Sequence, residues 1–343
     1  MSKTVFILGA GASISHSQRN FPSYNEFFSK ARTLNLINDK NSGKVLKEYE
    51  DLREYILKVM KADILSEKST LDIERLMTFM DIEIENNGDQ ESYKIQIYKE
   101  TLLKIIIMLF ETLSNNLKAE NGDYNNFVKD IKDKDNHTVI TFNWDLLLDR
   151  ILKGKKQYEN LEDLILSEMD LITYNKPIDY NLLSNNGYYL KLHGSIDWQY
   201  CSNNNCDANN KILISEGNIC GRCFKPFNRL IIPPIINKQY KTYPFIEKLW
   251  TLARIQLDAA QELVIWGYRL PPTDFYSNWL LSKTSNNVKK VSIVNPDCIL
   301  SGEGKDIRLN IKNFLKPFYD IYGEKKIVLY KDYKDYLSKN RIK

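Results

Sequence analysis

Short apolar runs that end in a glycine or a polar motif constrain this chain more than any other feature. One run, Val5 to Leu8, leads into a glycine-containing loop, and a second is followed by Asn143 and Asp145. A third run, Tyr188 to Leu192, is followed directly by His193. In an open parallel sheet, ligands bind beyond the carboxyl ends of the strands. We therefore expect these polar groups to share one crevice.

The loop after the first run contains two glycines and leads into a helix. Its residues are Gly9, Ala10, Gly11, Ala12 and Ser13. Such a strand-to-helix turn can direct free backbone N–H groups toward a phosphate. The third glycine of the dinucleotide fingerprint is missing, because Ile14 stands there. The loop alone therefore predicts a nucleotide site only weakly, and Ser13 suits either a phosphate contact or a helix cap.

Each polar residue after the later runs also has an ordinary structural interpretation. Asn143 and Asp145 suit the start of a helix through Leu146 to Leu148. A single histidine after a strand, such as His193, is more often structural than catalytic. His137 precedes a strand and so lies at the wrong end for the crevice, which favours a structural role, whereas the role of His16 stays open. It is the joint occurrence of the three motifs that favours a site.

The wider pattern alternates strands with helices. Further short apolar runs lie near 138–141, 230–232, 263–266, 291–294 and 326–330, and helical patterns lie near 245–261 and 274–283. This alternation predicts an α/β fold with a doubly wound, Rossmann-like parallel sheet. Apolar residues at helical spacing in residues 24–132 predict a large helical insertion between the first two motifs. We expect residues 1–343 to form a single domain that contains this insertion.

Four of the five cysteines form two closely spaced pairs. They are Cys201, Cys206, Cys220 and Cys223. Two tight loops that each present two sulfurs are what a tetrahedral zinc site needs, and four thiolates leave no open position for catalysis. The pattern predicts a small structural zinc module over residues 198–228, with unligated surface thiols as the alternative. Cys298 stands apart, which favours a buried or incidental role.

Composition excludes some classes of function. Lys and Arg number 48 against 44 Asp and Glu, and a net charge of +4 is too small to argue for nucleic-acid binding. No apolar stretch approaches the roughly 18 residues of a membrane span, and residues 1–10 lack the pattern of a signal peptide. Few cysteines outside the predicted zinc module suit an intracellular chain. We expect a cytoplasmic protein.

Six features of the chain follow one another in an order found in a known family. They are the loop from Gly9 to Ser13, the pair Asn143 and Asp145, the pair His193 and Gly194, the four cysteines, a strand leading to Gly267, and a strand ending in Val294 and Asn295. Together they resemble the sirtuin family of NAD-consuming enzymes, and the resemblance reaches most of the chain.

The resemblance implies how NAD would be held. The pyrophosphate would lie against the loop from Gly9 to Ser13, and Gly267 and Tyr268 would border the adenosine and phosphates. Asn295 would contact the adenosine ribose, and Asp297 would either reach the adenine or cap the next turn. Phe21 falls at the aromatic position of the family's first motif, counted without a gap.

The resemblance also implies the roles of the reacting residues. Asn143 would serve the ribose and the attacking water, and Asp145 would bind the nicotinamide carboxamide. His193 would be the general base, for which its ordinary pKa near 6.5 is suitable.

The chain departs from the sirtuin pattern at several positions. Pro22 stands where the family has an arginine, and Phe142 replaces the glutamine before Asn143. Sirtuin deacylases pair a Phe-Gly-Glu segment with the acyl-lysine peptide, whereas this chain reads Ile-Pro-Pro-Ile-Ile-Asn over residues 232–237. Prolines cannot donate a ladder hydrogen bond, which disfavours an added peptide strand.

Water is therefore the acceptor we favour. The sequence predicts a hydrolase that cleaves NAD into nicotinamide and ADP-ribose. Bacterial sirtuin-like proteins with a large helical insertion are similar to NAD-depleting effectors of antiphage defence, which often act as oligomers or beside a partner ATPase or sensor. One alternative is an NAD-dependent protein deacylase or ADP-ribosyltransferase. The other is a non-catalytic assembly module that binds NAD or ADP-ribose.

Overall fold

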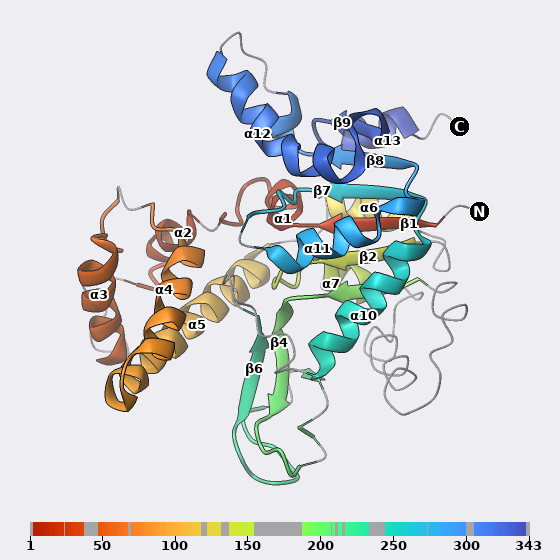
Figure 1. Ribbon diagram of the computed structural model, residues 1–343. Helices are drawn as coiled ribbons and strands as arrows, with labels where there is room; N and C mark the ends of the chain where they lie inside the picture. The colour runs from red at the N-terminus through yellow and green to blue at the C-terminus, as the bar shows by residue number, and fades with distance from the viewer. Residues whose placement is uncertain are drawn as a thin grey trace. The chain divides into compact units, whose positions relative to one another are not determined.

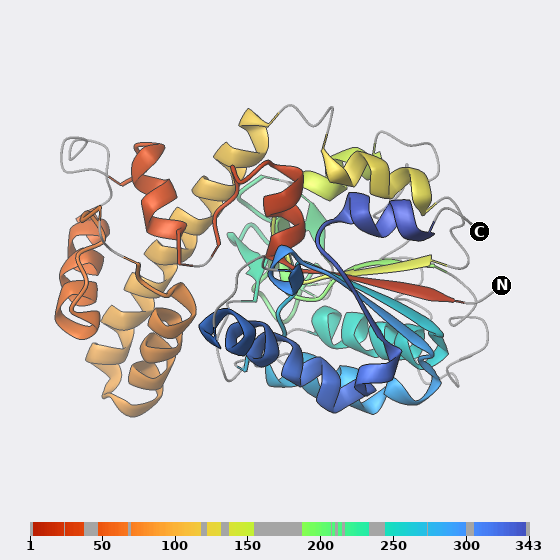
Figure 2. The same cartoon turned by 90° about the horizontal axis from the view of Figure 1, so that it is seen from above.

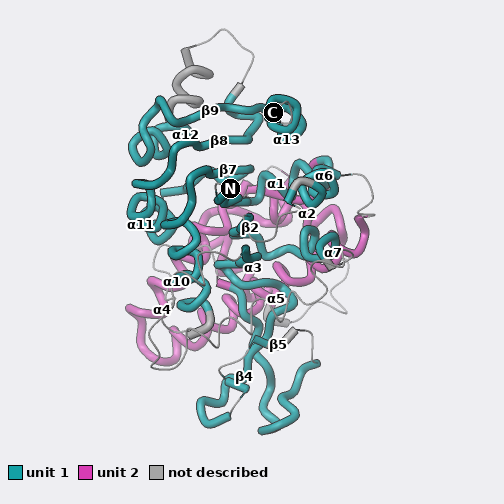
Figure 3. The backbone as a smooth tube through the Cα atoms, turned by 90° about the vertical axis from the view of Figure 1, so that its right-hand side faces the viewer, with its two compact units in different colours: residues 1–18, 119–231, 239–343 teal, residues 19–118, 232–238 magenta. Residues whose placement is uncertain are grey.

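The computed structural model divides the chain into two units. It describes residues 3–23, 25–37, 47–67, 70–117, 122–131, 137–153, 187–206, 208–209, 212–214, 217–232, 244–272, 274–299 and 305–340. The first unit comprises residues 1–18, 119–231 and 239–343, and the second comprises residues 19–118 and 232–238 (Figure 3).

A six-stranded parallel sheet forms the centre of the first unit (Figure 1). Its strands are β1 (Thr4–Leu8), β2 (His137–Thr141), β3 (Tyr189–Lys191), β7 (Glu262–Trp266), β8 (Lys290–Val294) and β9 (Ile327–Tyr330). Most side chains of β1, β2, β7 and β8 are buried, as expected for strands covered on both faces. The parallel, doubly wound sheet predicted from the sequence is confirmed.

Helices cover both faces of this sheet. Figure 2 shows α1 (Ala10–His16), α6 (Asp123–Asp130) and α13 (Tyr333–Asn340) on one face, and α10 (Pro244–Ala259) and α12 (Lys305–Tyr322) on the other. In the described part of this unit, the remaining helices are α7 (Leu147–Lys153), α11 (Phe275–Lys283) and the short 3₁₀ helices η4 (Ser285–Asn287), η5 (Pro296–Ile299) and η6 (Glu324–Lys326).

The strand order creates a switch point in the middle of the sheet. The order is β3-β2-β1-β7-β8-β9, so the chain builds outward from β1 in one direction and then returns to its other side with β7. This is the order of dinucleotide-binding sheets when the six strands are counted along the chain. Ligands of such sheets bind beyond the carboxyl ends of the strands that flank the switch point. Here those strands are β1 and β7, which pair in register from Thr4–Glu262 to Leu8–Trp266.

A separate antiparallel sheet carries the cysteines. It consists of β4 (Gly194–Cys201), β5 (Leu213–Ile214) and β6 (Phe227–Ile231), in the order β5-β4-β6. The apolar run predicted near 230–232 as a strand of the parallel sheet lies at the end of β6 instead. That assignment was wrong because a short apolar run does not reveal which sheet it joins. The run pairs with β4, as Gly194 lies opposite Ile231.

The second unit is built from helices. They are α2 (Phe27–Thr33), α3 (Lys47–Met60), α4 (Ile73–Asn86) and α5 (Asp89–Asn116). Asp72 caps α4, since its side chain accepts hydrogen bonds from the backbone of Glu74 and Arg75. Buried side chains at helical spacing, such as Leu76 and Met80, form its core. Among the described residues of both units, no helix combines the length and apolar character needed to cross a membrane.

Candidate functional site

Three glycines meet at the switch point of the sheet. The backbone N–H of Gly9 donates to the carbonyl of Trp266, and that of Gly11 donates to the carbonyl of Gly267, each at 3.0 Å. The N–H of Gly267 in turn donates to Val294 in β8 at 3.0 Å. These bonds join the first turn of α1 to the ends of β7 and β8.

Side chains have no room at this contact. A Cβ atom on Gly9 would lie 2.6 Å from the carbonyl oxygen of Gly267, and one on Gly11 would lie 2.7 Å from the Cα of Gly267. Gly267 has φ +66°, and a Cβ there would lie 2.2 Å from the backbone nitrogen of Ala12. The glycines are therefore needed for this close backbone approach. Ala10, between Gly9 and Gly11, is the exposed residue of the loop.

Asn143 and Asp145 both reach the glycine loop. The side-chain amide of Asn143 donates to the carbonyl oxygen of Gly9 at 2.9 Å and to Oγ of Ser13 at 3.0 Å. The Ser13 hydroxyl donates to Oδ2 of Asp145 at 2.7 Å. Ser13 is 2% exposed and Asp145 6%. The ends of β1 and β2 are thus joined by a buried polar network.

Asp145 also caps the following helix. Its Oδ1 accepts the backbone N–H of Leu147, the first residue of α7, at 3.0 Å. The capping interpretation of this residue is therefore realised. It coexists with the bond to Ser13, because the two carboxylate oxygens have different donors.

The buried side chain of Lys191 contacts the backbone of Asp145, and this lysine was not among the residues predicted from the sequence. Nζ of Lys191 donates to the backbone carbonyl of Asp145 at 2.7 Å and pairs with Asp149 at 3.1 Å. Burial raises the pKa of the Asp149 carboxyl, an effect that the nearby Lys191 charge opposes. The Tyr189 hydroxyl donates to the same carboxylate. A lysine inside the apolar run Tyr188 to Leu192 was the available signal, since a buried lysine requires a partner.

Tyr124 and His16 complete the network on the α1 side. The hydroxyls of Tyr124 and Ser13 lie 2.9 Å apart, and the Ser13 proton already serves Asp145, so Tyr124 is the donor. The His16 ring stacks on Tyr124 with centroids 4.8 Å apart. Nδ1 of His16 accepts the backbone N–H of Tyr124 at 3.3 Å. Burial lowers the pKa of His16, whose role the sequence left open and the structure shows to be packing between α1 and α6.

His193 lies in a separate cluster beyond the end of β3. Its ring centroid is 4.9 Å from that of Phe142, which stacks on Tyr268 at 4.5 Å. The Trp250 ring of α10 lies 6.4 Å from His193. The residue that replaces the family's glutamine, Phe142, thus makes apolar contacts with the predicted base and with Tyr268.

Asp274 faces His193 and was not among the predicted site residues. Its Oδ2 lies 3.9 Å from Nε2 of His193 and accepts the Tyr268 hydroxyl at 2.7 Å. Asp274 is 2% exposed and His193 6%. The sequence signal was weak, since an aspartate at the first position of the helix predicted over 274–283 is an ordinary capping residue.

The remaining residues that the sequence singled out lie in three different places. Asn295 follows β8, is buried, and accepts the backbone N–H of Asp297 through Oδ1 at 3.0 Å. The Asp297 carboxylate pairs with Arg269, next to Tyr268.

Phe21 belongs to the second unit, where it is buried and its ring lies 5.8 Å from that of Phe110. His137 begins β2 and packs against Phe6, at the amino end of the strands as expected.

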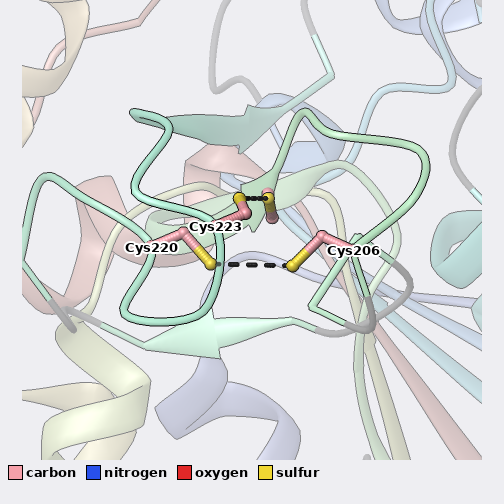
Figure 4. Close-up of side chains that lie close together, drawn as sticks. Cys206, Cys220 and Cys223 are labelled. Carbon is pink, nitrogen blue, oxygen red and sulfur yellow. Dashed lines mark hydrogen bonds between the residues drawn. The ribbon is translucent and has the colours of Figure 1, made fainter.

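The four paired cysteines converge in the small sheet. Their sulfur atoms all lie within 4.8 Å of one another. Cys206 and Cys220 face each other at 3.8 Å in Figure 4, and Cys201 and Cys223 lie 3.4 Å apart. A disulfide would need about 2 Å, whereas sulfurs about 2.3 Å from a shared zinc lie just under 4 Å apart. The set fits a tetrahedral zinc ion.

Backbone amides donate hydrogen bonds to two sulfurs of this cluster, although burial raises the pKa of Cys201 to about 12. The N–H groups of Asn203 and Lys225, each two residues beyond a cysteine, donate to the sulfurs of Cys201 and Cys223. The bond from Lys225 is the main reason that the pKa of Cys223 falls to about 6. A bound zinc ion would be held by the four sulfurs and would tie β4 to the loop before β6. No open position would remain for substrate.

Comparison with known proteins finds similar proteins by structure alone. No family model matches the sequence, and no curated protein matches it. Among solved structures, a complex of Sir2 with the inhibitor EX-527, 2'-O-acetyl-ADP-ribose and a deacetylated p53 peptide is 15% identical. The match covers 99% of this chain and 95% of that chain, with a TM-score of 0.41. The chain is similar to Sir2 proteins.

Two further Sir2 structures have different ligands. A complex of a Sir2 homologue with NAD is 11% identical, covers 93% of this chain and 91% of that chain, and has a TM-score of 0.39. A mutant Sir2 homologue in complex with ADP-ribose is 13% identical, with 93% of each chain covered and a TM-score of 0.37.

Proposed function

We propose that this protein is an NAD hydrolase that cleaves the nicotinamide–ribose bond and transfers ADP-ribose to water. One observation carries the proposal. Asn143 and His193 follow the neighbouring strands β2 and β3, and Asn143 bonds directly to the glycine loop at the switch point between β1 and β7. An amide, a histidine and a dinucleotide-type switch point at one edge of the sheet suit the handling of a dinucleotide.

Hydrolysis requires that the ribose is held, that the water is held, and that the water loses a proton. Cleavage of the nicotinamide–ribose bond develops positive charge on the sugar, so the water must attack from the opposite face. We assign Asn143 to hold the ribose and the water, and His193 to accept the proton of the water. The water oxygen bonds to the ribose carbon, and the bonding electrons of the broken bond leave with nicotinamide.

The buried position of Asp145 suits the orienting role proposed for it. Its carboxylate is held at both oxygens, by Ser13 and by the N–H of Leu147, so its place beside Asn143 is defined. Exchange of the Ser13 bond for the nicotinamide carboxamide would let substrate enter the network without leaving the carboxylate unpaired. Gly267, Tyr268 and Asn295, at the ends of β7 and β8, would border the adenosine half of the molecule.

Water as the acceptor rests on sequence. The segment that reads Ile-Pro-Pro-Ile-Ile-Asn starts at Ile232, and residues 233–237 lie outside the described part of the chain. The prolines in it cannot donate to an added peptide strand. In the cell, the same sequence resemblance suggests NAD depletion during antiphage defence, within an oligomer or beside an ATPase or sensor partner.

Nicotinamide release from NAD alone tests the proposal. The protein is separated by oligomeric state, and each fraction is incubated with NAD without any peptide while nicotinamide and ADP-ribose are quantified. We expect equal amounts of both products in at least one fraction. Release that requires an acyl-lysine peptide would favour the deacylase alternative instead, and tight NAD binding without turnover in every fraction would favour the assembly module.

Two variants test the assigned residues. Asn143→Ala and His193→Ala should each lose nicotinamide release. Asn287→Ala is a matched control, because Asn287 precedes β8, at the amino edge of the sheet, where its amide donates to the carbonyl of Asp258. Unchanged release in both site variants would refute the catalytic assignment.

A further inference from the structure

Asp274 occupies the capping position of a helix without capping it. It is the residue before α11, and its side chain makes no cap hydrogen bond. Aspartate at this position usually accepts a backbone N–H of the first turn. The Asp274 carboxylate is turned elsewhere, so its orientation needs another explanation.

The carboxylate is turned toward Tyr268 and His193. Oδ2 accepts the Tyr268 hydroxyl at 2.7 Å and lies 3.9 Å from Nε2 of His193. Tyr268 and Asp274 lie six residues apart, between the end of β7 and the start of α11, whereas His193 comes from the distant end of β3. At 2% exposure, the carboxylate is removed from water and depends on such partners.

The His193 ring is confined by its neighbours. The ring centroid of Phe142 lies 4.9 Å from that of His193. The Phe142 ring also stacks on that of Tyr268, with centroids 4.5 Å apart. Trp250 lies 6.4 Å away, and its indole N–H is held by the carbonyl of Leu192, the residue before His193. A ring packed in this way keeps Nε2 directed toward Asp274.

We propose that Asp274 is the positioning residue of His193. It holds the proton of the neutral imidazole on Nε2, leaves the lone pair on Nδ1 for the proton of the reacting water, and is itself oriented by the Tyr268 hydroxyl. The catalytic part of this inference rests on the proposed function. At 3.9 Å the carboxylate oxygen lies beyond hydrogen-bond distance from Nε2, but its negative charge favours the tautomer that places the positive end of an N–H dipole on that nitrogen.

The tautomer can be measured without any enzymatic reaction. The chain has three histidines, so nitrogen-15 labelling of histidine gives a spectrum with three imidazoles, and His193→Gln assigns the signal of interest. Long-range proton–nitrogen correlations then report which ring nitrogen of His193 carries the proton. We expect the Nε2–H form in the full chain at neutral pH. An Nδ1–H form would overturn the proposal with no variant required.

Two variants separate a positioning role from a purely structural one. Asp274→Asn keeps the size of the side chain and removes its charge, and we expect mixed tautomers at His193 and a loss of kcat on the order of 10- to 100-fold with KM little changed. Tyr268→Phe keeps the ring stack and removes only the hydroxyl that orients Asp274, so the Nε2–H form should be weakened less than in Asp274→Asn, which removes the charge itself. An unchanged tautomer in folded Asp274→Asn would overturn the proposal.

The outcomes distinguish this inference from the function on which it rests. An Nε2–H form that depends on Asp274, in a protein that does not cleave NAD, would support the positioning role and refute the proposed hydrolase. Cleavage of NAD by a protein whose His193 tautomer does not change in Asp274→Asn would support the proposed hydrolase and refute the positioning role.

Discussion

The side-chain amide of Asn143, just beyond β2, donates a hydrogen bond to Oγ of Ser13 in α1 at 3.0 Å. The same amide donates to the carbonyl oxygen of Gly9 at 2.9 Å. One residue therefore links the glycine loop to the neighbouring strand end, at the point where the sheet reverses its order.

Asn143→Ala should reduce kcat for NAD cleavage on the order of 100-fold or more, because the ribose and the water lose their positioning group. The variant also loses two hydrogen bonds, each worth about 1 kcal/mol, so the free energy of unfolding should fall by about 2 kcal/mol. Urea denaturation and initial rates of nicotinamide release check both parts. A rate within twofold of the unmodified protein would contradict the assigned role.

Gly267→Ala should destabilise the first unit through a steric clash as well as through its φ angle. A Cβ there would lie 2.2 Å from the nitrogen of Ala12, which is backbone that cannot rotate away. Gly323→Ala is the matched control, because Gly323 also has a positive φ, +78°, but a Cβ there would meet nothing within 4 Å.

The control measures the cost of a positive-φ backbone conformation alone, about 1–3 kcal/mol for alanine. Gly267→Ala should cost about 1–3 kcal/mol more, the usual penalty of overpacking. Unfolding midpoints of the two variants give the comparison. Equal losses of stability would show that the close approach of α1 to β7 is not needed.

The cysteine cluster should bind one zinc ion per chain, and Cys220→Ser should abolish that binding. The sulfur of Cys220 is one of four that lie within 4.8 Å of one another. Cys298→Ser is the matched control, since Cys298 is buried outside the cluster and burial raises its pKa to about 12. Atomic absorption after exhaustive dialysis measures the stoichiometry.

Removal of the metal should unfold the small sheet of β4, β5 and β6, because a structural zinc contributes directly to folding free energy. Chelation should therefore make residues 194–231 sensitive to protease. Equal zinc content in Cys220→Ser and Cys298→Ser would exclude the cluster as the metal site.

His16 should make the protein less stable as the pH falls below about 6.5. Burial lowers the folded pKa of His16, and its Nδ1 must stay unprotonated to accept the N–H of Tyr124. Below the unfolded pKa, the unfolded state binds the proton more readily than the folded state does, so the free energy of unfolding falls with pH until the folded pKa is passed.

Urea denaturation at pH 7.5 and 5.5 measures this effect. His16→Gln has no titrating ring and should show a smaller difference between the two pH values. His137→Gln, at the other end of the sheet, removes a histidine but keeps the His16 contribution. If both variants retain the full pH dependence, His16 is not its source.

Much of the fold was open to prediction because strands and helices are encoded locally. The runs that became β2, β3, β7, β8 and β9 were identified from a few adjacent apolar side chains each. The run near 230–232 was assigned to the wrong sheet, because the choice of partner strand depends on contacts with distant residues such as Gly194.

The candidate site was predicted in part for the same reason. Asn143, Asp145 and His193 stand next to strand ends, so their positions follow from local pattern. Asp274 and Lys191 were missed. Their importance lies in partners far away in sequence, and an aspartate before a helix or a lysine in a strand carries no such information by itself.

By itself, the sequence determined where the strands end, which polar groups follow them and how the four cysteines are spaced. These are short-range properties of the chain. Only the tertiary structure decided that Gly267 contacts Gly9 and Gly11, and that Asp274 faces His193. The physical reason is that both relationships arise from the packing of segments brought together by the sheet, where steric exclusion and the desolvation of a buried charge select the partners.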